Sequence, residues 1–416
     1  MMGRRTGRRS RLRGIVPPLL LFVLWPMGCQ HGQSGGAGGT PLVRVLLHEN
    51  RQRIEIAATG SPVVHVPPDA SGQALQFSQA AAVAVTLSSS GWRIGGVSLA
   101  GGELLLEQPA DGAVRIDNET YRGRFRLVPT TPGRFDVVNE LDVDSYLKGV
   151  LSSELFPNWH PEAYRAQAIA ARTYALYEAR TAGLARHFDV YADQRSQVYG
   201  GMRAETARSR DGADSTAGVV VAYGPAGHET IFKSYFSACC GGISQSAADA
   251  FNEASIPPLV DRDKGACCTE SPKFNWGPVV ITKTELTRRV RAWGAYKKRP
   301  EQTIGNIARV DLRWVNRFGR PTHFTVTDVR GMRYSLSSEQ FREAANTDAA
   351  PNAPKLFSSF CKPVDEGPSI RFADGHGYGH GVGLCQWCAQ HQAVAGWSHE
   401  SIVLDAFPQA KLMRAY

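Results

Sequence analysis

A single carboxylic acid with apolar neighbours is the residue of this sequence best suited to chemistry. Glu154 lies in the stretch LSSELFPNWHPEAY, where Leu151, Leu155, Phe156 and Trp159 surround it. Partial desolvation raises the pKa of a carboxyl group, so that the group keeps its proton near neutral pH. Such an acid can protonate a leaving oxygen, which is what cleavage of a glycosidic bond requires. The sequence therefore predicts that Glu154 is a general acid.

Two helices are expected to position Glu154. In DVDSYLKGVLSSEL, Asp142 or Asp144 can cap a helix, and apolar residues follow at helical spacing, so Glu154 falls near the end of that helix. Pro161 then begins PEAYRAQAIAARTYALYEAR, which runs about five turns without a breaker. The many alanines of this second segment favour close backbone packing.

A glycine-rich segment at 374–386, DGHGYGHGVGLCQ, is the second concentration of unusual chemistry. Its alternating glycines let the backbone bend tightly and approach a ligand closely. His376 and His380 offer donors, acceptors or metal ligands. The segment lacks the Walker lysine, so phosphate binding is not expected. It predicts either one wall of a binding site or a tight loop whose histidines bond to backbone groups.

Composition and charge place the chain among globular proteins. Its 416 residues are 43% hydrophobic and 20% charged, which is enough for a sizeable core and one to three folded units. Six arginines before Cys29, with no acidic residue among them, carry most of the formal charge of +9 and leave +3 for the rest. Because the remaining chain is only mildly basic, no nucleic-acid partner is expected.

The amino-terminal residues predict export. An apolar run at 15–27 follows the arginines and is too short to span a bilayer, so residues 1–28 are typical of a signal peptide. Cys29 follows a small residue, as at lipoprotein cleavage sites, although Pro26 stands where that pattern prefers Leu. Lipidation of Cys29 and an ordinary cleaved signal both stay open. We expect location in the cell envelope, either periplasmic or as a membrane-anchored lipoprotein, with the membrane contacted only through that anchor.

The order of patterns predicts an α+β fold. Residues 29–40 are a flexible Gly-rich tether, and residues 41–138 are a β-rich subdomain of short alternating runs. Residues 139–416 are expected to form a mixed α/β catalytic core assembled from distant sequence blocks, with an embedded α/β portion at about 274–360. The strand-like and helix-like runs expected in these parts are VRVLLH, RIEIAA, AVAVTL, ELLLEQ, YRGRFRLVP, RFDVVNEL, then TKTELTRRVRAWGAY (helix), IARVDLRWV, THFTVTDV, SSEQFREAAN (helix), and two short helices flanking Gly396.

Seven cysteines besides Cys29 form the least settled group. They are Cys239, Cys240, Cys267, Cys268, Cys361, Cys385 and Cys388. Exported proteins typically form disulfides, and the odd count leaves at least one thiol unpaired or bound to something else. Adjacent cysteines rarely bond to each other, so Cys239 and Cys240 are expected to reach toward the 267–268 pair or the 385–388 pair. We favour disulfides and expect no cofactor, but a zinc site drawn from these pairs stays open.

Five ordered blocks carry a resemblance to a known family. They are Tyr146-Leu147-x-Gly149-Val150 with Ser153-Glu154, Ala166-Gln167-Ala168-x-Ala170-Ala171-Arg172-Thr173-Tyr174, Gln197-x-Tyr199-Gly200-Gly201, Tyr235-Phe236-Ser237 with Gly241-Gly242, and Gly379-His380-Gly381-Val382-Gly383-Leu384-x-Gln386. Together they resemble the stage II sporulation protein D family, which also includes amidase enhancers. The blocks span residues 146 to 386, most of the chain after the signal.

The resemblance implies an activity and a set of site residues. Members with enzyme activity are lytic transglycosylases that cut peptidoglycan glycan strands, preferring strands stripped of stem peptides, and Glu154 matches their catalytic glutamate. Cys385 and Cys388 depart from the Ser and Gly usual in and just after the last block. The substrate-binding residues that we carry over are Gln167, Arg172, Tyr174, Tyr199, Ser237, His376, His380 and Gln386, with no metal among them.

Three rival functions stay open at this point. A two-carboxylate hydrolase would use Glu140, Asp142 or Asp144 beside Glu154. A thiol hydrolase would use Cys385 with a nearby histidine as base. A non-enzymatic wall-binding protein would enhance an N-acetylmuramoyl-L-alanine amidase as its partner, and its role should survive a Glu154→Gln change.

Overall fold

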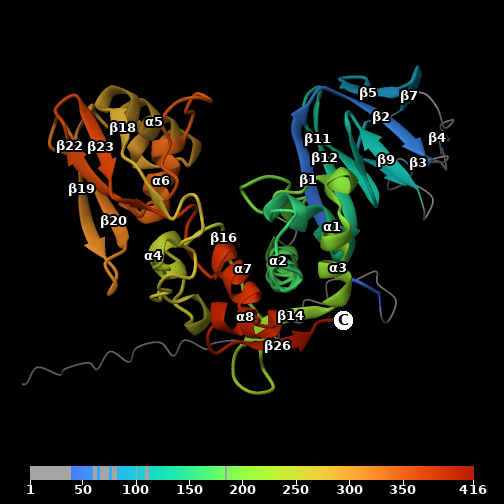
Figure 1. Ribbon diagram of the computed structural model, residues 1–416. Helices are drawn as coiled ribbons and strands as arrows, with labels where there is room; N and C mark the ends of the chain where they lie inside the picture. Colours follow the sequence, from blue (N-terminus) through green and yellow to red (C-terminus); the bar gives the residue numbers. More distant parts are fainter. Residues whose placement is uncertain are drawn as a thin grey trace, which may run out of the picture. The chain divides into compact units, whose positions relative to one another are not determined.

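The computed structural model describes residues 39–59, 63–65, 75–76, 82–99, 101–107, 112–182 and 185–416. The predicted signal peptide, Cys29 and all but the last two residues of the predicted tether lie outside these ranges. Within them, helices and several sheets combine into the α+β class predicted from the sequence, with a β-rich amino-terminal part (Figure 1).

Two larger sheets make up the amino-terminal part of the described chain. The first has the order β13 (Val190–Tyr191), β1 (Leu42–Arg51), β12 (Arg134–Asp142), β11 (Arg124–Thr131), β8 (Leu104–Glu107), β3 (Val63–His65), β4 (Leu75–Gln76). The second has the order β10 (Glu119–Tyr121), β9 (Ala113–Ile116), β2 (Arg53–Thr59), β5 (Val83–Ser88), β6 (Gly91–Ile94), β7 (Val97–Leu99). The rings of Trp92 and Phe135, one from each sheet, pack edge to face at 4.9 Å, so the two sheets share a core. All six strand-like runs predicted here are confirmed as strands.

Strand β12 leads directly into the helix that carries Glu154. It pairs antiparallel with β1 from Leu42 opposite Asp142 onward, and it is buried along almost its whole length. Its last residue, Asp142, accepts a hydrogen bond from the backbone N–H of Ser145 at 2.8 Å and so caps α1 (Val143–Glu154). Of the two caps that the sequence offered, the structure uses Asp142.

Close packing fixes α1 against the chain that follows. A Cβ on Gly149 would lie 2.6 Å from the ring of Tyr199, so only glycine lets this ring reach the helix. The predicted long helix is confirmed as α2 (Pro161–Ala182), and all of its alanines except Ala179 are buried. Helix α3 (Ala207–Ser215) packs on both α1 and α2.

The carboxyl-terminal residues return to this first core. Helices α7 (Gln386–Val394) and α8 (His399–Ala406) pack on α2, as Figure 1 shows, and confirm the two predicted helices on either side of Gly396. Strand β16 (Phe236–Ser237) pairs in parallel with β25 (Leu384–Cys385). This pairing places Ser237 beside the end of the glycine-rich loop, where α7 begins. A small sheet nearby has the order β15 (Thr230–Ile231), β14 (Val219–Tyr223), β26 (Lys411–Arg414).

The chain between β16 and β25 contains a second hydrophobic core, whose residues run from Trp276 to Phe372. The predicted helices and strands of this portion are confirmed as α5 (Lys283–Tyr296), α6 (Ser338–Asn346), β19 (Ile307–Val315) and β20 (Pro321–Asp328). Four strands were not predicted, namely β18 (Val279–Thr282), β21 (Arg333–Ser337), β22 (Lys362–Asp365) and β23 (Ser369–Ala373). The remaining elements between β16 and β25 are α4 (Ala247–Phe251), β17 (Asn275–Trp276) and β24 (Gly375–His376). Single 3₁₀ turns lie at Gly201–Ala204, Pro257–Leu259 and Pro300–Thr303.

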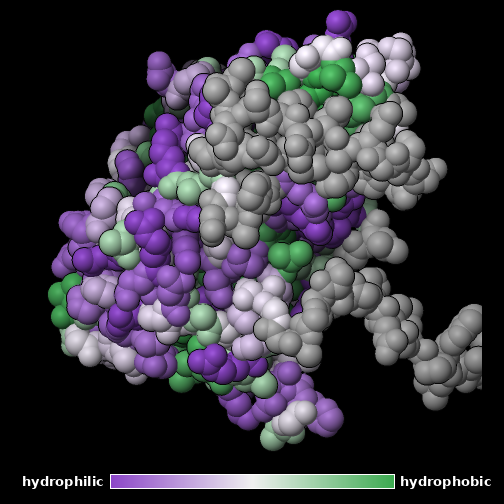
Figure 2. Space-filling model, turned by 90° about the vertical axis from the view of Figure 1, so that its right-hand side faces the viewer, coloured by the Kyte–Doolittle hydropathy of each residue, from purple (hydrophilic) through white to green (hydrophobic). Residues whose placement is uncertain are grey.

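The face of the molecule shown in Figure 2 is predominantly polar. Among the described residues on the face in Figure 2, hydrophilic side chains predominate and hydrophobic ones form small separate areas. In the same part of the chain, no helix has both the length and the apolar character needed to cross a bilayer.

Candidate active site

Glu154 is the last residue of α1, and two donors hold its carboxylate. The helix ends here because Leu155 adopts an extended backbone and Pro157 follows, while the Leu155 N–H still bonds to the Leu151 carbonyl at 3.0 Å. The backbone N–H of Val198 donates to Oε1 of Glu154 at 2.9 Å. The amide Nε2 of Gln386 donates to Oε2 at 3.3 Å. The structure thus brings together two of the predicted site residues, Glu154 and Gln386.

The surroundings of Glu154 favour its protonated form. Burial raises the pKa of this carboxyl group above its ordinary value, and the hydrogen bonds from Val198 and Gln386 lower the pKa by less. The side chain nevertheless remains partly exposed to solvent, so a ligand can reach it. This combination is the one expected of a proton donor near neutral pH.

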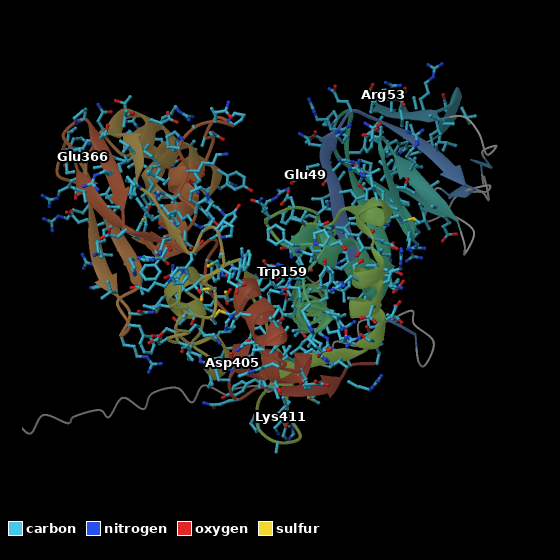
Figure 3. All side chains as sticks on the ribbon, viewed as in Figure 1. Glu49, Arg53, Trp159, Glu366, Asp405 and Lys411 are labelled. Atoms are coloured by element: carbon cyan, nitrogen blue, oxygen red, sulfur yellow. A yellow bond between two sulfur atoms is a disulfide. The ribbon has the colours of Figure 1, made fainter. Side chains whose placement is uncertain are left out.

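Three aromatic side chains form a cluster beside Glu154. The ring of Trp387 lies 5.0 Å from that of Trp159 and 5.9 Å from that of Phe156, and the Phe156 and Trp159 rings lie 5.4 Å apart. Trp159 is labelled in Figure 3. Phe156 is 53% exposed, so the cluster presents a ring to solvent within two residues of the carboxylate. Trp387 was missed in the sequence although it directly follows Gln386 in the last family block.

Arg172 is placed where no ligand reaches it. Its side chain is fully buried, and its guanidinium donates to Asp144 Oδ1 at 2.7 and 2.9 Å. Its other donors bond to the carbonyls of Ala213 and Val219 and to the hydroxyl of Thr216. These bonds tie α2 to α1, α3 and β14, so Arg172 holds the fold of this region together rather than lining its surface.

Three more predicted substrate-binding residues also lie in the core. The Tyr199 hydroxyl donates to Asn139 Oδ1 at 3.3 Å, and its ring packs on that of Tyr146. Tyr174 packs edge to face against Tyr235 and is 7% exposed. Gln167 is 1% exposed, and both polar atoms of its amide lack a protein partner among the described residues. Their burial gives Tyr174 and Tyr199 packing roles.

The glycine-rich loop is tightly bonded to its surroundings. Four of its five glycines have positive φ, as predicted for tight bends, and a Cβ on Gly383 would lie 2.1 Å from the Tyr235 carbonyl oxygen. His380 Nδ1 accepts the Val382 N–H at 2.9 Å, which leaves the proton of the neutral ring on Nε2. The hydroxyl of Ser237 accepts the Gly381 N–H at 3.1 Å. His380 and Ser237 therefore bond to backbone groups within a tight loop, which is the second of the two structures predicted for this segment.

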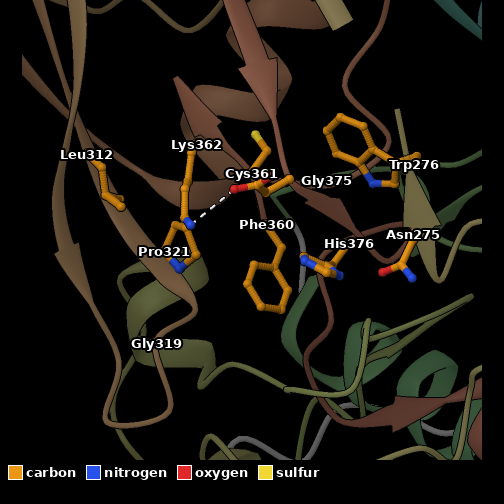
Figure 4. Close-up of a pocket in the computed structure, with 11 residues that line it drawn as sticks. Asn275, Trp276, Leu312, Gly319, Pro321, Phe360, Cys361, Lys362, Gly375 and His376 are labelled. Atoms are coloured by element: carbon orange, nitrogen blue, oxygen red, sulfur yellow. Dashed lines mark ion pairs between the residues drawn. The ribbon is translucent and has the colours of Figure 1, made fainter. Parts of the chain in front are cut away.

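His376 lies at a different place, in a cavity of about 550 Å³ shown in Figure 4. Its ring lies 4.9 Å from that of Phe360, and burial lowers the pKa of its imidazole. Glu154 is not among the residues that line this cavity. His376 therefore belongs to a different place from the candidate active site around the Glu154 carboxylate. The lining residues are Asn275, Trp276, Leu312, Gly319, Pro321, Phe360, Cys361, Lys362, Asp374, Gly375 and His376.

The buried imidazole of His380 makes stability depend on pH. Burial lowers the pKa of this group from 6.5 to about 4. Because the unfolded chain then binds a proton at a higher pH than the folded one, folding stability is full above about pH 6.5 and falls as pH drops toward 4, by up to about 3 kcal/mol. We expect His380→Asn to flatten this slope in urea unfolding curves measured from pH 7 to pH 4. His391→Asn, on the exposed side of α7, should keep it, and an unchanged slope in His380→Asn would contradict the assignment.

The cysteines confirm one disulfide and leave a cluster of thiols. Cys267 and Cys388 are bonded, whereas Cys239, Cys240, Cys268, Cys361 and Cys385 are free and buried. Cys239 and Cys240 were expected to bond with the other two pairs, but both are free. The Cys240 sulfur nevertheless lies 3.6 Å from that of Cys268 and 4.0 Å from that of Cys388. Burial raises the pKa of Cys385 well above its ordinary value, which argues against a nucleophilic thiolate there.

Comparison with known proteins agrees with the blocks found in the sequence. The family described as stage II sporulation protein matches residues 131–223, which include Glu154 and all of α2. The stage II sporulation protein D of Bacillus subtilis is 26% identical over 299 residues, covering 68% of this chain and 78% of that protein. The chain belongs to the stage II sporulation protein D family.

Two further relatives are similar to this chain over about two thirds of its length. An uncharacterised protein of Brachyspira hyodysenteriae is 29% identical over 284 residues, covering 68% of this chain and 69% of that protein. The amidase enhancer of Bacillus subtilis is 22% identical over 301 residues, covering 64% of this chain but only 40% of that longer protein.

Proposed function

We propose that this protein is a peptidoglycan lytic transglycosylase and that Glu154 is its general acid and base. The observation that carries the proposal is a single, partly exposed carboxyl group whose pKa is raised by burial, held by Val198 and Gln386 beside an aromatic cluster. Peptidoglycan lies outside the cytoplasmic membrane, so the proposal includes export to the cell envelope, as the residues at 1–28 predict.

One carboxyl group suffices for this reaction. Protonated Glu154 gives its proton to the glycosidic oxygen as the bond from C1 of muramic acid to that oxygen breaks. The resulting carboxylate then takes the proton from the C6 hydroxyl of the same sugar while its oxygen bonds to C1 and closes a 1,6-anhydro ring. The acid is regenerated, and no water is consumed.

The neighbouring carboxylates support this chemistry over two-carboxylate hydrolysis. Asp144 lies ten residues before Glu154 on α1, which is about 15 Å along the helix axis, beyond the separations of about 5–9.5 Å that hydrolases use. It is also bonded to Arg172, while Asp142 caps α1. Glu140 is held by two arginines of β11. The partners of these three acids favour structural roles for them over activation of a water molecule beside Glu154.

The aromatic cluster fits a sugar chain as ligand. Ring faces are large apolar surfaces that pack on the C–H faces of sugars, and exposed Phe156 extends the cluster toward solvent. A glycan stripped of stem peptides offers those faces without obstruction. We therefore expect peptide-stripped strands to be the better substrate.

Mass spectrometry of the products tests the proposal. Peptide-stripped peptidoglycan is incubated with the mature protein, and the expected products carry 1,6-anhydro-muramic ends. Products with reducing ends would show that the reaction is hydrolysis and not lytic cleavage. Intact strands would overturn the enzymatic proposal.

A non-enzymatic role is the second candidate, because one relative carries the name amidase enhancer. In that case the protein would bind the wall and stimulate an N-acetylmuramoyl-L-alanine amidase without cutting glycan. Adding the protein to such an amidase and measuring released stem peptides distinguishes the two candidates, since stimulation by a Glu154→Gln variant would need no glycan cleavage.

The hydrogen bond from Gln386 predicts a shift in pH dependence. The bond stabilises the carboxylate of Glu154 and lowers its pKa, so Gln386→Leu should raise that pKa further. The alkaline limb of the kcat/KM profile should then move to higher pH, because the acid form persists longer. Gln390→Leu, one turn further along α7, should leave the profile in place, and an unmoved limb in Gln386→Leu would refute the role given to the amide.

A further inference from the structure

The sulfur atoms of four buried cysteines, three of them free thiols and the fourth in the disulfide with Cys267, converge on one point beside α7. The sulfur atoms of Cys240, Cys268, Cys385 and Cys388 all lie within 4.8 Å of one another. In tetrahedral zinc sites the Zn–S bonds are about 2.3 Å, so neighbouring sulfurs are about 3.8 Å apart. The Cys240 sulfur lies at 3.6 and 4.0 Å from those of Cys268 and Cys388, on either side of that value. The sulfur positions therefore match a tetrathiolate metal site.

The fold brings these four cysteines together from three separate stretches of chain. Cys240 follows β16, Cys268 lies in the turns after α4, and Cys385 ends β25. Cys385 is also the residue that caps α7, and Cys388 follows it by three positions, which places both on one side of the first turn. Sulfur atoms gather beside α7 in Figure 3.

A buried cation adjoins the cluster. Arg320 is fully buried and donates from Nη1 to the carbonyl of Cys240 at 2.7 Å. Its Nη2 donates to the carbonyl of His380 at 3.0 Å, whereas its Nε has no partner among the described residues. In that part of the chain, no carboxylate forms an ion pair with Arg320. A buried charge needs a compensating one, and zinc with four thiolates carries a net charge of −2.

We propose that the reduced protein binds one Zn²⁺ through Cys240, Cys268, Cys385 and Cys388, with Arg320 balancing the negative charge of the site. The Cys267–Cys388 disulfide is then the alternative, oxidised state, because Cys388 cannot serve both partners. A dithiol opens this bond by supplying two electrons and two protons, and itself becomes a disulfide. Zinc then replaces the thiol protons of its four ligands, while Cys267 stays a thiol.

The zinc site has a consequence for Glu154, and this part rests on the proposed function. Cys385 directly precedes Gln386, whose amide donates to Glu154. A metal that fixes Cys240 to Cys385 also fixes the pairing of β16 with β25, and thereby the start of α7. Zinc would act on cleavage only by positioning Gln386, without touching substrate.

Metal binding is tested with cobalt, which reports its ligands by colour. Anaerobic protein reduced with a dithiol, then freed of it, is titrated with Co²⁺. One equivalent should produce the sulfur-to-cobalt charge transfer and visible bands of a tetrahedral four-thiolate site, and Zn²⁺ should displace it. Protein that keeps the Cys267–Cys388 bond should bind less than one tenth as much. A reduced protein without these bands, or with bands of fewer thiolates, would overturn the proposal.

Matched cysteine variants separate ligands from bystanders. Cys267→Ser keeps the four ligands and removes the competing disulfide, so it should bind one metal ion without added reductant. Cys268→Ser should weaken binding by at least about 100-fold. Cys361→Ser alters a buried thiol in the second core and should bind like the wild type. Equal loss in Cys361→Ser and Cys268→Ser, or a Cys240–Cys268 disulfide in anaerobically purified Cys267→Ser, would count against the site.

The coupling to cleavage is measured separately in the Cys267→Ser protein. Zinc-loaded protein should cleave peptide-stripped glycan faster than the same protein after chelation, with circular dichroism checking that both are folded. Equal rates would remove the coupling and leave the metal site standing. Absence of cleavage in both forms, with the cobalt spectrum intact, would instead contradict the proposed function.

Discussion

Replacing Glu154 with glutamine is expected to lower glycan cleavage by about 10³ to 10⁴-fold, the upper part of the range for loss of a general acid. The large effect follows because one carboxyl group serves both proton transfers of the proposed reaction. The glutamine amide is nearly isosteric with the protonated acid and can still contact Val198 and Gln386, so fold and glycan binding should remain. Anhydro-muramic ends counted by mass spectrometry measure the loss.

A shorter acid provides the matched control. Glu154→Asp keeps a carboxyl group but withdraws it by one methylene, so its activity should fall between those of the wild type and Glu154→Gln. Asp214→Asn, which alters an exposed carboxylate of α3, should leave the rate unchanged. Full activity in Glu154→Gln would transfer the acid role to another residue.

Replacing Arg172 with methionine is expected to lower the free energy of unfolding by about 3–5 kcal/mol, because it leaves Asp144 without its buried partner. The side chain of Asp144 is only 13% exposed. Methionine also cannot donate the hydrogen bonds that Arg172 gives to the carbonyls of Ala213 and Val219. A residue that merely bound substrate would raise KM and leave stability intact. Urea unfolding curves of the two proteins measure the difference.

Arg165 supplies the comparison on the same helix. It is seven residues before Arg172 on α2, and its side chain is 28% exposed, paired with Glu162 and Asp211 at the surface. Arg165→Met should cost no more than about 1 kcal/mol, as surface ion pairs usually do. Similar losses in both variants would deny Arg172 a special structural role.

Part of the site was visible in the sequence because it rests on local patterns. The position of Glu154 near a helix end, a cap at Asp142 or Asp144 and the breaker-free run after Pro161 are all local patterns, and the structure confirms them in α1, capped by Asp142, and α2. The donor from Val198 was not visible, because a backbone N–H is present in every residue except proline and its partner depends on tertiary structure.

The polar side chains of α2 show why the rest could not be predicted. Arg172 and Arg165 share a face in the sequence, and a polar face is ordinarily solvated. In the structure α2 is covered by α1, α3, α7 and α8, so its polar residues meet buried partners from distant parts of the chain. Which of two similar arginines is buried depends on those neighbours, and the helical pattern alone contains no information about them.

The hydrogen bond between Glu154 and Gln386 joins positions 232 residues apart. During synthesis the amino-terminal helices leave the ribosome long before α7 does, so a nascent chain contains the proposed acid without the residue that orients it. Any proteolytic cut and loss of the later segment would produce the same incomplete site. The order of the chain thus makes the proposed catalytic centre a late product of folding, assembled only when the segment beginning at Gln386 has docked.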